Sequence, residues 1–118
     1  MQQINLHNCL IGRFYFKKTQ NGNLIGEFSN NKIDFILTES ADIQNGKIST
    51  DFIGIYNTTW QQNGQNFFAI LIISNKQNTS HKIYEVEWND TSGKPIFFGQ
   101  GFIVNDILIG DYRDFKII

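Results

Sequence analysis

A five-residue pattern recurs four times along the chain and constrains the fold more than any other feature. The pattern is apolar–Ile–Gly–x–aromatic, and its copies begin at Leu10, Leu24, Phe52 and Leu108, with successive offsets of 14, 28 and 56 residues. On a β-strand, residues i and i+2 share a face, so the first residue, the glycine and the aromatic point to one side. Fourteen residues fit one strand and its turn, so the spacing predicts a series of antiparallel hairpins.

Eight segments rich in β-branched and aromatic residues alternate with turn sequences, which is typical of strands. They span residues 10–19, 24–29, 32–38, 47–60, 66–74, 82–89, 95–104 and 107–115. Asn-Gly pairs at 21–22, 45–46 and 63–64 are strong hairpin signals. The segment 39–45 is expected to be a loose link, with a helical turn over 38–44 as the alternative. The long fourth segment needs a bend, for which Gly54 is the candidate.

Short connections favour sequential antiparallel neighbours, and closing such a sheet removes its exposed edges. We therefore predict an all-β fold, an eight-stranded antiparallel up-and-down β-barrel, with a two-sheet β-sandwich as the alternative. The length of 118 residues predicts a single domain over residues 1–118.

The strand motifs resemble those of avidin-like barrels and, more broadly, of calycin-type barrels such as lipocalins. Repeated apolar–x–Gly–x–aromatic strands are found in both groups, and residues 83–89 resemble an avidin-type middle strand. Gly12-x-Phe14 stands where a lipocalin shows Gly-x-Trp, and Arg113 resembles the late lipocalin arginine that packs over the first-strand aromatic. The resemblance implies a calycin-like barrel.

Alternation along the strands predicts which aromatic side chains point into the barrel. The tyrosines and tryptophans assigned to the interior are Tyr56, Trp60, Tyr84, Trp88 and Tyr112. These side chains combine an apolar ring with a polar group, which suits a binding cup for a small, partly apolar ligand. The alternative is that they fill the core, and that the protein is a protein–protein interaction module.

The opposite faces of the fourth and fifth segments are aliphatic. Ile53, Ile55, Ile70 and Ile72 fall opposite the proposed interior. An exposed apolar patch of this kind usually marks association, so we expect a homo-oligomer formed through these four residues.

The remaining composition argues against several function classes. A net charge of −1 disfavours a nucleic-acid partner, and no apolar run approaches the roughly 20 residues of a membrane span. No signal peptide is visible at the N-terminus, so a cytoplasmic location is expected. The single Cys9 disfavours a disulfide or zinc framework, and His7 and His81 show no catalytic partners. We therefore expect no metal, cofactor or catalytic residue, with a small barrel isomerase or cyclase as a remote alternative.

Overall fold

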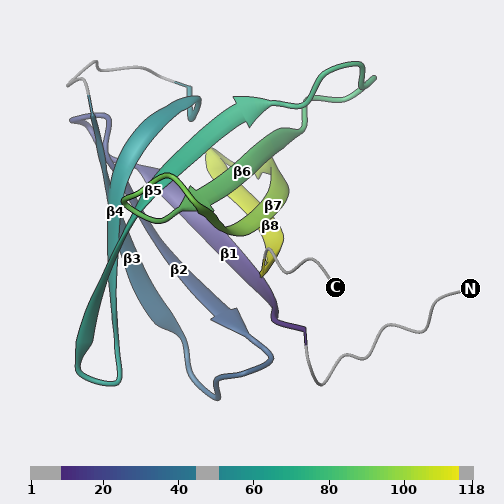
Figure 1. The fold of residues 1–118 in the computed structure, drawn as a ribbon. Helices are drawn as coiled ribbons and strands as arrows, with labels where there is room; N and C mark the ends of the chain where they lie inside the picture. Colours follow the sequence, from purple (N-terminus) through teal and green to yellow (C-terminus); the bar gives the residue numbers. More distant parts are fainter. Residues whose placement is uncertain (1–8, 45–50, 115–118) are drawn as a thin grey trace, which may run out of the picture.

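The computed structural model describes residues 9–44 and 51–114, which form eight strands in a closed barrel. The strands are β1 (Ile11–Lys18), β2 (Leu24–Asn30), β3 (Leu37–Ile43), β4 (Gly54–Gln62), β5 (Gln65–Asn75), β6 (Tyr84–Asn89), β7 (Pro95–Val104) and β8 (Ile107–Asp114). Each strand is antiparallel to the next, and β8 returns to pair with β1 (Figure 1). The predicted up-and-down barrel is confirmed, and the sandwich alternative is wrong.

The repeated pentapeptide behaves as its alternation predicts. Its first, third and fifth residues point into the barrel, and those that belong to the buried core or pack against it are Leu10, Phe14, Leu24, Phe28, Phe52, Tyr56, Leu108 and Tyr112. The four isoleucines at its second position are all exposed on the outside: Ile11, Ile25, Ile53 and Ile109. The motif therefore marks the inward face of four of the barrel's segments.

The glycines of the motif permit close packing inside the barrel. A methyl group added to Gly26 would lie 1.9 Å from the carbonyl oxygen of Tyr15 on the neighbouring strand. One added to Gly12 would lie 2.4 Å from the ring of Tyr112, which covers the bare backbone at that point. These positions exclude larger residues because of close approach rather than backbone conformation.

Tight hairpin turns occur where the turn chemistry predicts them. Asn63 and Gly64 both have positive φ, 53° and 75°, as do Asn105 and Asp106, at 50° and 65°. Positive φ at both central residues matches the right-handed twist of the flanking strands. The Asn-Gly pair at 45–46 lies outside the described residues.

The third strand is displaced from its predicted position. It runs over Leu37–Ile43 rather than residues 32–38, so residues 39–43 belong to a strand and not to the expected loose link or helical turn; residue 45 lies outside the described residues. Residues 31–36 instead make a loop in which the Asn31 side chain accepts from the N–H of Ile11 and donates to the Cys9 carbonyl. Those side-chain hydrogen bonds hold the start of the loop against β1, and Phe35 and Ile36 later in the loop are exposed.

Two other expectations need correction. The fourth strand begins at Gly54, where the bend was expected, and its predicted first residues 47–50 lie outside the described residues. Arg113 does not cover Phe14, because it lies on the outer face of β8, with its guanidinium 5.1 Å from the centre of the Phe98 ring.

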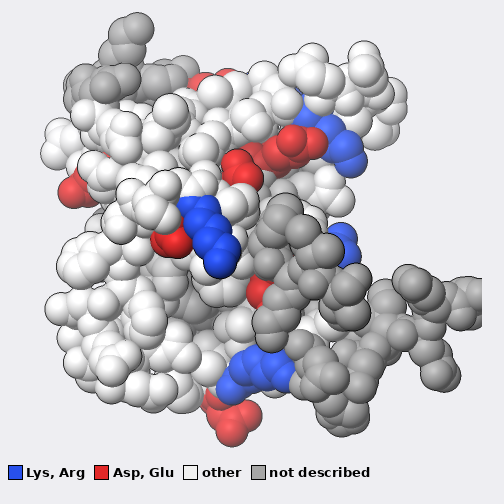
Figure 2. Space-filling view, viewed as in Figure 1, with Lys and Arg blue, Asp and Glu red and all other residues white. Residues whose placement is uncertain are grey.

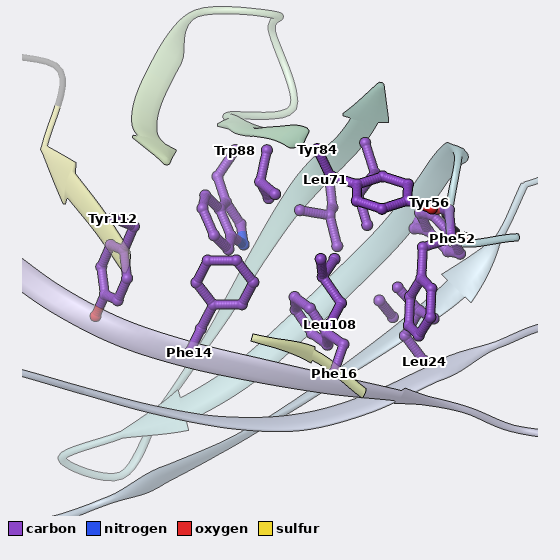
Figure 3. Close-up of a cluster of buried hydrophobic side chains, with 13 residues drawn as sticks. Phe14, Phe16, Leu24, Phe52, Tyr56, Leu71, Tyr84, Trp88, Leu108 and Tyr112 are labelled. Carbon is purple, nitrogen blue, oxygen red and sulfur yellow. Dashed lines mark hydrogen bonds between the residues drawn. The ribbon is translucent and has the colours of Figure 1, made fainter. Parts of the chain in front are cut away.

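The barrel interior is filled at one end. Figure 3 shows the buried side chains in a row that runs from Tyr112 through Phe14 and Trp88 to Tyr56 and Phe52. At the latter end the Tyr56 hydroxyl donates to the Phe52 carbonyl at 2.7 Å. The adjacent Asp51 accepts from the Tyr84 hydroxyl at 3.0 Å and forms an ion pair with Lys82 at 3.2 Å. This end of the barrel is therefore closed; the other end carries the cavity described below.

The surface carries no extended field of one sign on the face shown in Figure 2, where acidic and basic side chains are interspersed among uncharged ones. No helix long and apolar enough to cross a membrane is present within residues 9–44 and 51–114.

Candidate ligand-binding cup

A cavity of about 280 Å³ opens at the end of the barrel where β2 joins β3, β4 joins β5 and β6 joins β7. Its aromatic lining comes from six strands and consists of Phe28, Trp60, Phe67, Trp88, Phe97 and Tyr112. Its polar lining consists of Asn30, Lys32, Glu39 and Gln62. A concave, mostly aromatic surface with a few polar groups is the usual character of a small-molecule site.

Four rings form a closed circuit around the cavity. The ring centres of Phe28 and Trp60 lie 6.0 Å apart, those of Trp60 and Phe97 6.5 Å, those of Phe97 and Tyr112 5.7 Å, and those of Tyr112 and Phe28 6.2 Å. Three of these contacts are nearly perpendicular, an arrangement that aromatic quadrupoles favour. We call these four residues the aromatic girdle.

Trp88 connects the girdle to the filled core. It lies edge-on to Phe14 with ring centres 5.5 Å apart, and it contacts Tyr112 at the same separation. It is 4% exposed, whereas the girdle residue Trp60 is only half-buried. Trp88 therefore contributes to the base of the cup and Trp60 to its wall.

A carboxyl group lies at the base of the cup. Glu39 is 3% exposed and comes from β3, where it pairs with Trp60 of β4 and Gly26 of β2. Its Oε2 atom accepts hydrogen bonds from the Thr58 hydroxyl at 2.5 Å and from the Trp88 indole N–H at 2.9 Å. A buried carboxyl with two donors is anchored in one orientation.

Burial raises the pKa of Glu39 to about 7, because the ionised form loses its hydration; the hydrogen bonds from Thr58 and Trp88 act in the opposite direction. Glu39 therefore changes charge near neutral pH. Perturbed carboxyls in concave sites are frequent at functional positions.

Burial also raises the pKa of Tyr112 to about 12, opposed by the hydrogen bond from Asn30 and reinforced by the negative charge of Glu39. The Tyr112 hydroxyl accepts from the Asn30 amide at 3.0 Å and donates to the Ser29 carbonyl at 3.4 Å. This phenol is therefore neutral at physiological pH and held in place at the side of the cup.

The structure separates the five aromatic residues that the sequence predicts for the site. Trp60, Trp88 and Tyr112 line the cavity together. Tyr56 and Tyr84 lie buried toward the closed end, and their hydroxyls donate to Phe52 and Asp51 there. Alternation alone assigns all five to the interior but cannot tell at which height along the barrel each one lies.

Sequence reasoning misses the phenylalanines of the lining, Phe28, Phe67 and Phe97, and it also misses the carboxyl of Glu39. Assigning residues 39–45 to a link removed it from any strand, and a carboxyl at an inward position contradicts the expected apolar alternation. The signal that identifies it is the pair Ala41 and Ile43, which share its face at a spacing of two residues and pack in the core.

The groups usually associated with metal binding or nucleophilic catalysis are dispersed. Residues 9–44 and 51–114 hold no cluster of three or more His, Cys, Asp or Glu side chains suited to a metal ion. Cys9 is half-buried and His81 is exposed in a loop, while His7 lies outside the described residues.

Comparison with protein-family models, with curated proteins and with solved structures finds no match to this chain. The resemblance to avidin-like and calycin barrels therefore remains a prediction, and the function has to be inferred from the cup itself.

Proposed function

We propose that this protein binds a small, partly apolar ligand in the cup without chemically changing it. The observation that carries the proposal is a buried carboxyl, Glu39, at the base of an aromatic cavity of about 280 Å³. In an ordinary core this position would carry an apolar residue, because burying an ionisable group is costly. A polar group at the base of an apolar cup supports specific recognition.

The size of the cavity limits the ligand. Typical small-molecule sites measure roughly 300–1,000 Å³, so this cup matches a compact molecule of about one ring with a short substituent. The rings of Trp60 and Tyr112 offer apolar faces to such a molecule, and the Glu39 carboxyl offers a hydrogen-bond acceptor.

Intrinsic tryptophan emission provides a direct test. The chain contains two tryptophans, and both line the cavity. Titration with neutral 2-phenylethanol should change the emission saturably, and Trp60→Phe and Trp88→Phe should each remove part of the change. Ligand recovered unaltered by mass spectrometry supports binding alone. The absence of saturable change with 2-phenylethanol, 2-phenylethylamine and 3-phenylpropionate would contradict the proposal.

The pKa of Glu39 favours a small barrel isomerase or cyclase as the second candidate. A carboxyl that titrates at about pH 7 can act as a general base or acid under physiological conditions. Conversion of a bound compound that is lost in Glu39→Gln would establish this candidate over simple binding.

A further inference from the structure

The two oxygens of the Glu39 carboxyl have different surroundings. Oε2 accepts the hydrogen bonds of both Thr58 and Trp88. Oε1 accepts none from the described residues, although Glu39 lines the cavity. A carboxylate has acceptor capacity on both oxygens, so Oε1 is the atom through which Glu39 can receive a donor from a molecule in the cup.

The walls around this carboxyl are aromatic. The girdle surrounds the cavity, and Trp88 contacts Tyr112 beside the carboxyl with ring centres 5.5 Å apart. The faces of aromatic rings carry negative electrostatic potential, and they attract organic cations within about 6 Å of the ring centre. The carboxylate of Glu39 at the bottom of the cup and the aromatic rings of its walls both favour a cationic ligand.

The other charged or titratable groups on the cavity are few. Within the described part of the chain they are Lys32, exposed in the loop between β2 and β3, and Tyr112, which is neutral. The residues that pair with Glu39 or donate to it carry no side chain that titrates near neutral pH: Gly26 on β2, Thr58 and Trp60 on β4, and Trp88 on β6 across the interior. No buried cation therefore balances an ionised Glu39 within the described barrel.

We propose that the ligand of the cup carries a protonated amine on an aromatic or aliphatic body, and that this ammonium donates to Oε1 of Glu39 while the body packs within the aromatic girdle. The inference rests on the proposed function, since it presumes that the cup holds a ligand. A charge-assisted hydrogen bond in a buried site is about twice as strong as a neutral one.

The competing occupant is a carboxylate attracted by Lys32. The ammonium of an exposed lysine is well hydrated and contributes little to binding. An anion in the cup would also lie close to the Glu39 carboxyl, where like charges in a low dielectric repel. The buried carboxylate of Glu39 therefore affects the charge of the ligand more than the exposed ammonium of Lys32 does, and an ammonium fits the cup better than a carboxylate.

Three probes that differ mainly in their end group test the inference: 2-phenylethylamine, 2-phenylethanol and 3-phenylpropionate. Binding is measured by calorimetry at pH 8, where Glu39 is ionised, for the full chain, for Glu39→Gln and for the control Glu85→Gln. Glu85 is exposed on the outer face of β6, so its variant makes the same chemical change away from the cup.

The expected result is binding of the amine at least about tenfold tighter than the alcohol, with the carboxylate weakest. The preference for the amine should vanish in Glu39→Gln and persist in Glu85→Gln. In the unmodified chain it should decrease severalfold between pH 8 and pH 6, as Glu39 gains its proton. This last measurement stands even where Glu39→Gln fails to fold.

Three results overturn the inference in distinguishable ways. Equal affinities for the amine and the alcohol contradict the ammonium while leaving the cup as a binding site. Tightest binding of 3-phenylpropionate shows that Lys32 rather than Glu39 sets the preference. No binding of any probe removes the proposed function and this inference together.

Discussion

The indole N–H of Trp88 donates to the Oε2 atom of Glu39 at 2.9 Å, joining residues 49 positions apart in sequence. Both side chains come from strands on different parts of the barrel wall, β6 and β3, and they meet inside it. The bond links the aromatic floor of the cup to its only buried carboxyl among the described residues. Several of the expected properties of this protein depend on that pair.

The stability of the barrel should depend on pH through Glu39. The pKa of this carboxyl is 4.5 in ordinary surroundings and about 7 in the fold, so between these values the native state holds a proton that the unfolded state has lost. The free energy of unfolding therefore falls as pH rises from 4.5 to 7, by on the order of 3 kcal/mol, and levels off above pH 7.

Urea unfolding at a series of pH values measures this contribution. Glu39→Gln should lack the decrease, whereas Glu85→Gln, on the exposed face of β6, should follow the unmodified chain. A Glu39→Gln profile parallel to that of the unmodified chain would show that another group causes the dependence.

The two tryptophans should differ in their effect on stability. Trp88 is 4% exposed and packs against Phe14, so Trp88→Ala should cost about 3–5 kcal/mol, as truncation of a core aromatic does. Trp60 is half-buried at the mouth, so Trp60→Ala should cost less than half as much, and it should weaken any binding in the proposed cup. Urea unfolding separates the two variants, and equal losses would place Trp60 in the core instead of the cup wall.

Two glycines at the same position of the repeated motif should tolerate alanine very differently. A methyl group at Gly26 meets the Tyr15 backbone at 1.9 Å, which forces β1 and β2 apart, so Gly26→Ala should cost about 3 kcal/mol or more. At Gly54 the nearest atom is the end of the flexible Ile43 side chain at 2.9 Å, so Gly54→Ala should cost less than about 1 kcal/mol. Thermal unfolding compares the pair; similar losses would mean that the spacing between strands is not the constraint.

We expect self-association through the outer faces of β4 and β5. Ile55 and Ile72 pair directly across these strands on the outside, and Ile53 and Ile55 are 37% and 45% exposed. Burying each such side chain against a partner contributes roughly 1.5–3 kcal/mol before the cost of association. Sedimentation equilibrium should show a species heavier than the 13.6 kDa chain.

The double variant Ile55→Lys with Ile72→Lys should dissociate this oligomer and keep the β-sheet circular dichroism spectrum. A 13.6 kDa monomer of the unmodified chain would contradict the expectation.

The fold was accessible from the sequence because several local signals agree. The pentapeptide sets which residues point inward, and turns such as Asn63-Gly64 set where the chain reverses. With eight segments and short connections, closure of the sheet follows from the need to cover its edges.

The site was only partly accessible, for two physical reasons. Alternation has a period of two residues and carries no information on height along the barrel, so Tyr56 and Tyr84 could not be separated from Tyr112. The apolar residues Ile33, Phe35 and Ile36 imitate a strand, whereas the true β3 carries Glu39 at an inward position. The apolar alternation that identifies a strand in the sequence is broken in β3 at Glu39, which is the residue that gives the cup its carboxyl.

The interior of the barrel is open at one end only. At the other end Tyr56 and Phe52 fill it, and Asp51 contacts Lys82 and Tyr84. The barrel therefore encloses a cavity and not a channel. A ligand of the proposed cup would therefore enter, and the water it displaces would leave, through the same opening. The rate at which a ligand of the proposed cup leaves would then depend on the passage through the mouth as well as on the contacts broken at the base. A loop or another molecule that covered the mouth would slow the release of such a ligand without contacting Glu39.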